Sequence, residues 1–486
     1  MVEIKSNTSQ TTSEETEQAV PALSLKCLPE TKGLQTDASL KEFFVDINIH
    51  ADDEDEEAQD EDKAIGGQNR NSLFLVAVID RSGSMGGSKL EMTKKTLKFL
   101  IEELTSKDQL SIVAYDTNVD TLLEPTYMTE EGKATGTKIA NSLRSLSMTN
   151  LAGGLQTGLL KVPAELDATP AVFIMTDGLA NVGISSATGI VSMMNEVQSR
   201  DAVGRCPVHT FGYGSDHDAT FLRTIAEAAE GMYYFIENDD QILDAFADCV
   251  AGLLTTRYQT MLLEVEAKEA SINKIMTKRK IEEIKKGTHY RVSVGDLQAG
   301  EDRDVLISFD VGALAGKPAG TAVLASVSLS YFDVKEEKMG SKTASVTVTR
   351  ADHLSKELSE KDAHVEAQKL RVQVSDVIRE AVELGDKGDV TAGREKLLGF
   401  VDTLNKSPIA KESFCQVWMK DVTTHAENMK TQECYQRKGN KMMNNAVHCY
   451  SAQRAANAWE GSELEAQACF ETKARVFAKK KAAKFK

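Results

Sequence analysis

Hydrophobic residues follow two different spacings in the first half of the chain. Residues 73–79 form a nearly continuous apolar run, which is typical of a central strand buried on both faces. The next apolar residues recur every three or four positions, as in an amphipathic helix that packs one stripe against a sheet. These residues are Leu90, Leu97, Leu100, Ile101 and Leu104. Strands and helices alternate in this way as far as Leu254, which predicts an α/β sheet with helices on both faces.

The same spacings place the remaining elements of this α/β domain, which we expect to span residues 71–255 and to contain six strands. Further strands are expected at 110–115, 119–123, 171–176, 208–212 and 232–236. Helices are expected at 133–146, 154–162, 188–198, 218–229 and 239–254. The link of Asp116, Thr117 and Asn118 is short enough for a hairpin, so the sheet should be mostly parallel with one antiparallel edge strand.

Beyond Thr255 the helical spacing stops and short strands rich in β-branched residues follow. They lie at 261–267, 288–294, 304–310, 322–332 and 343–348, and predict a β-sandwich over residues 256–350. Residues 39–50 contain an alternating segment that we expect to be the first strand of this sandwich, with the α/β domain inserted after it. Residues 351–486 are expected to be helical, with a helical hairpin broken near Gly385–Gly388.

Three segments lack apolar spacing. Residues 1–38, polar and low in aromatic residues up to about Ala22, are expected to be disordered. Residues 51–70 form an acidic linker that reads as a solvated loop, with a partner-binding acidic segment as the alternative. The lysines at the C-terminus fit a solvated helix end attracted to this acidic loop, or a nuclear signal. They are Lys479, Lys480, Lys481, Lys484 and Lys486.

The charge and cysteine content narrow the class of protein. The net charge of -17 argues against binding to nucleic acid or to anionic membranes. The N-terminus lacks the apolar stretch of a signal peptide, and no apolar run reaches transmembrane length, so no membrane insertion is expected. The seven cysteines are odd in number and widely spaced, unlike a disulfide scaffold. These features predict a cytoplasmic protein in a reducing compartment.

Oxygen-bearing side chains follow two of the predicted strands and one loop. Asp80, Ser82 and Ser84 come directly after the first buried strand, Thr149 lies in a loop between helices, and Asp177 follows strand 171–176. Ligand crevices in α/β sheets lie at the carboxyl ends of strands. Hydroxyl and carboxylate oxygens suit a hard cation such as Mg²⁺ or Ca²⁺.

The order D-x-S-x-S, then T, then T-D-G, resembles the metal-ion-dependent adhesion site of von Willebrand factor A domains, and the resemblance covers about 72–254. It implies that Ser82, Ser84 and Thr149 coordinate the ion directly or through water, and that Asp80 and Asp177 act mostly through water. The family's glycine pair before the threonine is replaced here by Ser147 and Met148, which puts the path of that loop in doubt.

Such a site favours binding over catalysis. Neutral hydroxyls and water leave the cation, Mg²⁺ or alternatively Ca²⁺ or Mn²⁺, with an open position that an Asp or Glu of a partner protein would complete. The rim should then contribute to affinity. By resemblance to the fold, the candidates for this rim are Met85, Leu179, Asn181 and Tyr213, which could equally be packing residues.

Other readings of these residues remain open. The serines and threonine could merely cap helices. The turn around Ser84 has part of the nucleophile elbow of a serine hydrolase, with His217 as a conceivable base, but its first glycine is absent. Cys434, His448, Cys449 and Cys469 suggest zinc, but their spacing lacks paired C-x-x-C knuckles. No phosphate-binding glycine motif occurs.

We therefore expect a non-enzymatic interaction module that binds an acidic residue of a partner through a divalent cation. The alternative is a scaffold or adaptor, for example in a ubiquitin-related complex, that binds through its β-sandwich or helices while the metal is only structural. Some intracellular multidomain proteins that resemble this chain carry a RING and act as ubiquitin ligases, but this chain has no RING. A serine hydrolase is the third reading.

Overall fold

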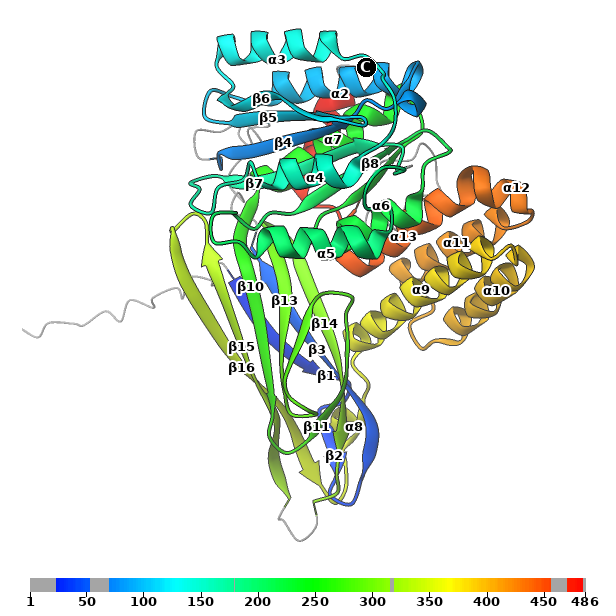
Figure 1. Cartoon of the computed structure of the whole chain (residues 1–486). Helices are drawn as coiled ribbons and strands as arrows, with labels where there is room; N and C mark the ends of the chain where they lie inside the picture. The colour runs from blue at the N-terminus through cyan, green and yellow to red at the C-terminus, as the bar shows by residue number, and fades with distance from the viewer. Residues whose placement is uncertain (1–22, 53–69, 179, 315–318, 456–469, 484–486) are drawn as a thin grey trace, which may run out of the picture.

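The computed structural model describes residues 23–52, 70–178, 180–314, 319–455 and 470–483. They form three units: an α/β unit, an elongated β-sandwich that extends from one side of it, and a helical unit beside both (Figure 1). The α/β unit is built around a six-stranded sheet in the order β6-β5-β4-β7-β8-β9. Its strands are β4 (Leu73–Asp80), β5 (Gln109–Tyr115), β6 (Val119–Tyr127), β7 (Thr169–Thr176), β8 (Val208–Tyr213) and β9 (Tyr233–Ile236).

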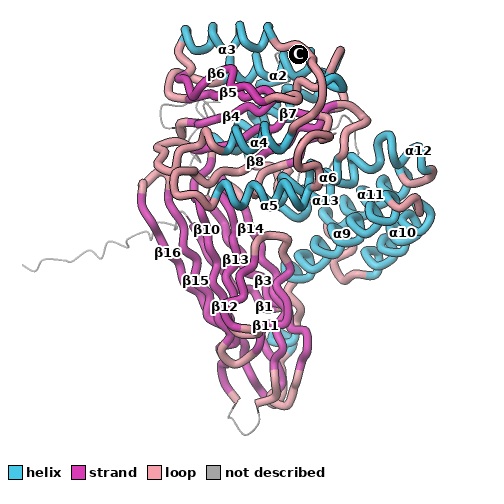
Figure 2. Tube along the Cα trace, in the orientation of Figure 1, coloured by secondary structure: helices cyan, strands magenta, loops and turns pink. Residues whose placement is uncertain are grey.

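Only β6 runs antiparallel to its neighbour, as the short link before it predicts, and the other pairs are parallel. The central strand β4 is buried along its whole length because helices cover both faces of the sheet. One face carries α2 (Ser88–Glu103), α3 (Glu130–Ser142) and α7 (Asp239–Leu254). The other carries α4 (Leu151–Leu159), α5 (Ala187–Gln198) and α6 (Ala219–Ala228), as Figure 2 shows. The predicted fold class of this unit is confirmed.

Two sheets pack face to face in the β-sandwich. The smaller sheet has the order β1-β3-β14-β11 and the larger the order β12-β13-β10-β15-β16-β2. Their strands are β1 (Leu23–Pro29), β2 (Gly33–Gln35), β3 (Leu40–Ala51), β10 (Thr256–Ala267), β11 (Ser271–Met276), β12 (Ile281–Lys285), β13 (His289–Gln298), β14 (Asp302–Val311), β15 (Gly320–Asp333) and β16 (Lys338–Ala351). Inward side chains such as Val45 of β3 and Leu263 of β10 form one apolar core between the sheets.

Residues 23–38 correct the expectation that residues 1–38 are disordered. Strand β1 pairs antiparallel with β3 from Leu23 to Pro29, and β2 pairs parallel with the end of β16. The composition of this segment is polar, but Leu23 and Leu25 alternate and pack against the sandwich core. Strand β3 is therefore the third strand of the sandwich and not the first. Residues 1–22 and 53–69, where the disordered tail and most of the acidic linker were expected, lie outside the described residues.

The C-terminal region is helical, as predicted. Its helices are α8 (Lys356–Ser359), α9 (Ala363–Asp386), α10 (Val390–Lys406), α11 (Ser413–Asn428), α12 (Gln432–Cys434), a π-helical turn (Tyr435–Gly439), α13 (Asn440–Ala452) and α15 (Lys473–Ala483). Helices α9 and α10 form the expected hairpin, and Gly388 between them has a φ of 89°, a conformation that favours glycine.

Helix α13 completes the α/β unit, although it comes long after that unit in the sequence. It packs against α6, which lies beside it in Figure 1, and against β9. Its Met442 joins the core on one face of the sheet, and its Cys449 joins the core on the other. The amide of Asn445 donates to the carbonyl oxygen of Tyr233 at 3.2 Å, so buried polar residues of α13 bond to the backbone of the sheet.

The final helix, α15, packs against α7 of the α/β unit. The guanidinium of buried Arg475 lies 3.3 Å from a carboxylate oxygen of Asp248, and Lys479 lies 3.2 Å from the other oxygen. The expectation of a solvated basic end is therefore wrong for Lys479, because its ammonium group pairs with the buried carboxylate of Asp248 on α7. Lys484 and Lys486 lie outside the described residues. Among the described helices, none is long and apolar enough to cross a membrane.

Candidate metal centre

The predicted site lies where β4 and β7 end. The two strands are parallel neighbours, with Ile79 opposite Met175, so Asp80 and Asp177 leave the sheet at the same edge. A short 3₁₀ turn, Gly83–Met85, follows β4 and presents Ser84 to solvent. Ser82, Thr149 and Asp177 are each at most 1% exposed. Asp80 is also fully buried, so four of the five predicted residues are buried and Ser84 is the exposed one.

Backbone hydrogen bonds tie the three loops of this site together. The amide of Gly83 donates to the carbonyl oxygen of Ser147 at 2.9 Å. The amides of Asn181 and Val182 both donate to the carbonyl oxygen of Thr149 at 3.1 Å. The middle loop, which lacks the family's glycine pair, is thus fixed on one side by the loop after β4 and on the other by the loop after β7.

Asp80 uses both carboxylate oxygens within the protein. One oxygen accepts from the backbone amide of Ser82 at 2.8 Å, and the other accepts from the hydroxyl of Thr176 at 2.6 Å. Burial raises the pKa of Asp80 to about 6, against the hydrogen bonds from Thr176 and Ser82, which lower it. Because both oxygens are already engaged, this side chain is suited to orient a ligand shell and less suited to enter it.

Asp177 has one carboxylate oxygen without a partner. Its Oδ2 accepts from the ammonium group of Lys89 at 3.2 Å, and Lys89 also donates to Asp216 at 2.8 Å. Its Oδ1 is buried and makes no hydrogen bond. Burying a polar atom without a partner is costly, so an unpaired carboxylate oxygen at this edge fits a group that supplies positive charge.

The hydroxyl groups are not used as helix caps. Ser82 is the N-cap of the 3₁₀ turn but makes no capping hydrogen bond, and its hydroxyl lies 3.1 Å from that of Ser84. The N-caps of the neighbouring helices are Gly87 for α2 and Asn150 for α4. The capping interpretation therefore fails for Ser82, Ser84 and Thr149. The hydroxyl oxygens, together with the unpaired oxygen of Asp177, fit the oxygen-ligand chemistry of a hard divalent cation.

The rim differs from the sequence-based expectation. Met85 and Tyr213 belong to the core under the sheet and are fully buried, so they are packing residues. Asn181 is exposed, and its side-chain oxygen accepts from the amide of Thr149 at 2.8 Å. Leu179 lies outside the described residues. The exposed apolar side chains next to the site are instead those of Leu146 and Met148, which are 53% and 48% exposed in the loop before Thr149.

Sequence reasoning missed Leu146 and Met148, although one signal was present. Met148 stands where the family has its glycine pair, and an apolar residue in that polar loop has no packing role. Leu146 was placed at the end of the expected helix 133–146, whereas α3 ends at Ser142 and leaves it in the same loop.

The structure does not support the serine hydrolase reading. Both ring nitrogens of His217 are engaged, one with the carbonyl oxygen of Gly214 and the other with the hydroxyl of Tyr233, each at 2.6 Å. Burial lowers the pKa of His217 to about 4. With no nitrogen left to accept a proton from Ser84, His217 is unsuited to act as its base.

The zinc reading of Cys434, His448 and Cys449 also loses support. Cys434 is exposed on α12, whereas His448 and Cys449 are buried in α13, where Nε2 of His448 lies 3.0 Å from the carbonyl oxygen of Gly231. Cys469 lies outside the described residues.

The fold and the loop cluster define the class of the inserted unit: a doubly wound α/β domain with an oxygen-lined site at the carboxyl edge of its sheet. Its family follows from a direct match. Residues 74–235 match the profile of the von Willebrand factor type A domain, so the chain carries a domain of this family.

Two curated relatives match part of the chain. The chain is 27% identical over 253 residues to the E3 ubiquitin-protein ligase WAV3 of Arabidopsis thaliana, which covers 51% of this chain and 32% of that protein. It is 32% identical over 209 residues to inter-alpha-trypsin inhibitor heavy chain H3 of Pongo abelii, which covers 40% of this chain and 22% of that protein. The matches thus span about a third or less of either relative.

Two solved structures share the architecture over most of the chain. The von Willebrand factor type A protein from Catenulispora acidiphila has a TM-score of 0.63 at 15% identity, covering 84% of this chain and 91% of that one. The ArnB paralog VWA2 from Sulfolobus acidocaldarius has a TM-score of 0.55 at 13% identity, covering 88% and 98%. At these identities the likeness concerns the fold alone.

Proposed function

We propose that this chain is a non-enzymatic interaction module that binds an Asp or Glu of a partner protein through a divalent cation. Ser82, Ser84 and Thr149 would hold the cation directly or through water, and Asp80 and Asp177 would act mostly through water. Mg²⁺ is the first candidate, with Ca²⁺ or Mn²⁺ as alternatives. When bound, such an ion supplies an open coordination position to which a carboxylate can bind.

The observation that carries this proposal is the unpaired Oδ1 of Asp177, buried at the edge where the hydroxyls of Ser82 and Ser84, which cap no helix, lie. Two further facts support it. Domains of this family commonly mediate interactions between proteins. Leu146 and Met148 are exposed apolar residues in the loop before Thr149, and they would provide an apolar rim that excludes water from a carboxylate contact and so strengthens it.

The protein's own residues divide the work. Asp80 holds the backbone of Ser82 through one oxygen and the hydroxyl of Thr176 through the other, which fixes the turn after β4. Lys89 neutralises Oδ2 of Asp177 and leaves Oδ1 as the only acceptor of that carboxylate without a partner. This arrangement adds little negative charge to the site, so the cation keeps its attraction for an acidic partner.

The test measures metal binding and partner binding separately. Mn²⁺ binding to the full chain would be followed by calorimetry for the wild type, Ser82→Ala and Asp177→Ala, with Ser192→Ala as matched control because Ser192 is exposed on α5. We expect both site variants to weaken Mn²⁺ binding at least tenfold, and the control to leave it unchanged. Proteins retained on the immobilised chain in Mg²⁺ and released by chelator would then be identified by mass spectrometry.

A retained set that is unchanged by chelator and by Asp177→Ala, in variants that melt like the wild type, would contradict the metal-bridged contact. That result would favour a second function, a scaffold or adaptor that binds through its β-sandwich or helices. The likeness of half of the chain to the plant ubiquitin ligase supports a place for such a scaffold in a ubiquitin-related complex. In that case the metal would only stabilise the A-type domain.

A further inference from the structure

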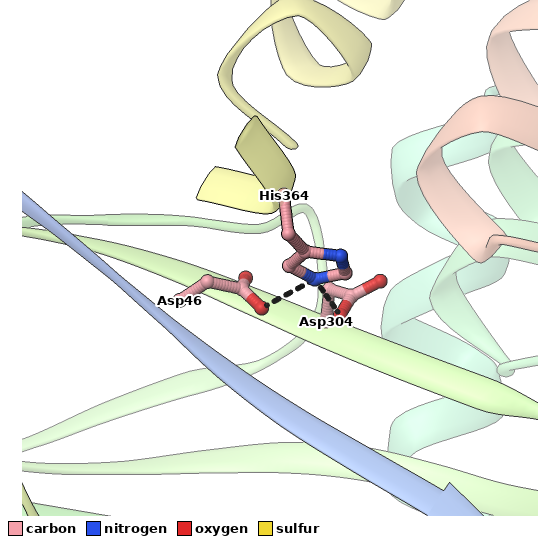
Figure 3. A group of neighbouring side chains, drawn as sticks. All are labelled: Asp46, Asp304 and His364. Atoms are coloured by element: carbon pink, nitrogen blue, oxygen red, sulfur yellow. Dashed lines mark hydrogen bonds and ion pairs between the residues drawn. The ribbon is translucent and has the colours of Figure 1, made fainter. Parts of the chain in front are cut away.

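A second group of possible metal ligands lies away from the A-type domain, where the helical unit meets the sandwich. His364 in the first turn of α9 faces Asp46 of β3 and Asp304 of β14 (Figure 3). In the part of the chain that the structure describes, these three residues are the one group of His, Cys, Asp and Glu side chains with ligand atoms within 4.8 Å of one another. The proposed function of the A-type domain makes no use of them.

The three side chains converge on one point. Nε2 of His364 lies 3.2 Å from Oδ2 of Asp46 and 3.1 Å from Oδ1 of Asp304. Ligands bound to one ion at 2.0–2.1 Å are about 3.3 Å apart in a tetrahedral site and about 2.9 Å apart in an octahedral one. The two separations from Nε2 fall between these values, and the two carboxylate oxygens lie within 4.8 Å of each other, so side-chain movement alone can bring all three atoms to one ion.

Hydrogen bonding alone leaves this cluster unsatisfied. One Nε2–H carries one proton, which two carboxylates share in the absence of a metal. The other oxygen of Asp46, Oδ1, is buried without a hydrogen-bond partner, and Asp46 is fully buried. A buried carboxylate with an unpaired oxygen is the second sign, independent of the distances, that a positive group belongs here.

The surroundings resemble a prepared ligand shell. The side-chain amide of Asn48 donates to Oδ1 of Asp304 at 2.8 Å, and such a bond orients a ligating carboxylate. The side chain of His364 is 40% exposed, which gives an ion a path from solvent. Arg371 is buried close enough to both carboxylates to add positive charge, so affinity should fall short of that of a four-ligand structural zinc site.

A neighbouring histidine provides the contrast. His50 of β3 also contacts two aspartates, Asp52 and Asp302, but it does so through different ring nitrogens. Its partners therefore lie on two sides of the ring and cannot share one ion with the same nitrogen. His50 therefore makes two separate ion contacts near the surface, whereas Asp46 and Asp304 both approach the same nitrogen of His364.

We propose that Asp46, Asp304 and His364 bind a divalent transition-metal ion of the zinc class. Imidazole nitrogen with two carboxylate oxygens is a ligand set found around zinc, and one imidazole favours zinc over magnesium. Because the ligands come from β3, β14 and α9, the bound ion fastens the start of the helical unit to the sandwich.

The test is a titration of Zn²⁺ into the full chain with Mg²⁺ in excess, so that the site of the A-type domain is occupied. Cys434, the exposed cysteine among those that the structure describes, is replaced by serine in every variant to remove a competing thiol. Cys469, which lies outside the described residues, is replaced as well. We expect one Zn²⁺ per chain. Asn48→Ala should weaken its binding about 10- to 100-fold, and His364→Ala by more. His50→Ala, the matched control, should leave it unchanged.

X-ray absorption at the zinc edge provides a second readout. Nitrogen and oxygen at about 2.0–2.1 Å without sulfur at about 2.3 Å would support the triad. Equal Zn²⁺ binding by the wild type and His364→Ala, or no binding by either, would overturn the proposal and leave the triad as an ion pair between α9 and the sandwich. The Zn²⁺ titration is independent of the cation site at Asp177. Ser82→Ala, which disrupts that site, should therefore leave Zn²⁺ binding unchanged.

Discussion

A buried carboxylate, Glu301, is one of several polar contacts that join the sandwich to the end of α13, and its removal gives a quantitative prediction. Glu301 is 4% exposed in the turn between β13 and β14. Its two oxygens accept from Nε and Nη2 of Arg454, just after α13, at 2.6 and 2.9 Å. One of them also accepts from the amide of Gln298 at 2.9 Å.

The pKa of Glu301 gives the magnitude. Burial alone would raise it, but the guanidinium groups of Arg454 and Arg303 outweigh burial and hold the pKa at about 2, below its usual 4.5. This difference corresponds to about 3 kcal/mol. Because the folded pKa is depressed, the stabilisation is complete above about pH 4.5 and is lost as the pH falls toward 2. Glu301→Gln should therefore lower the free energy of unfolding at pH 7 by about 3 kcal/mol.

The assay is urea denaturation followed by circular dichroism at pH 7 and pH 3. The gap between wild type and Glu301→Gln should shrink from about 3 kcal/mol at pH 7 to about 1 kcal/mol at pH 3, where most of the linked stabilisation is gone. The matched control is Asp302→Asn, one residue away, because its side chain is 58% exposed. This control should cost at most about 1 kcal/mol. Equal losses for both variants at pH 7, or a gap that does not change with pH, would refute the reasoning.

Four other outcomes are expected. Met148→Ser should weaken the chelator-sensitive retention of partners several-fold but leave Mn²⁺ binding unchanged, since the side chain is exposed in the loop before Thr149. Retention equal to that of the wild type would show that Met148 is not part of the rim. Gly154→Ala should destabilise by about 1–3 kcal/mol, because a Cβ there lies 2.4 Å from the ring of Tyr115. Gly399→Ala, in an exposed helix with open space around it, should stabilise by up to about 1 kcal/mol in the same thermal unfolding assay. Arg475→Met should speed hydrogen exchange in α15 at least tenfold but leave β4 unchanged, because it breaks a buried ion pair.

The α/β unit was predictable because its apolar spacings are long and regular. Strand β4 is apolar throughout, and the stripe of α2 marks the face that it buries. Strand β12 was missed for the opposite reason, since all five of its residues are exposed and its two isoleucines, Ile281 and Ile284, lie three positions apart and so do not alternate. Strand β1 was missed because a polar, low-aromatic composition was given more weight than the alternation of Leu23 and Leu25.

For the candidate sites, the sequence could supply residues only where a motif orders them. Asp80, Ser82 and Ser84 follow a strand in a fixed spacing, and Thr176 with Asp177 ends another. The triad of Asp46, Asp304 and His364 has no such order, because its members come from three elements that only the folded sandwich brings together. Likewise, α13 reads as a polar helix, and nothing in its sequence says that a β-sheet edge will bury its Asn445.

The placement of α13 sets an order of events during synthesis. The A-type domain ends with α7 at Leu254, but Met442 and Cys449, which complete its two cores, are translated long afterwards. Strand β3 likewise waits for β14, which follows the whole inserted domain. During synthesis, the A-type domain therefore leaves the ribosome with the surface that α13 later covers still exposed, and β3 leaves it without its partner β14. Exposed apolar surface and unpaired strand edges promote aggregation until the C-terminal half emerges. Truncation after the A-type domain would make that transient exposure permanent.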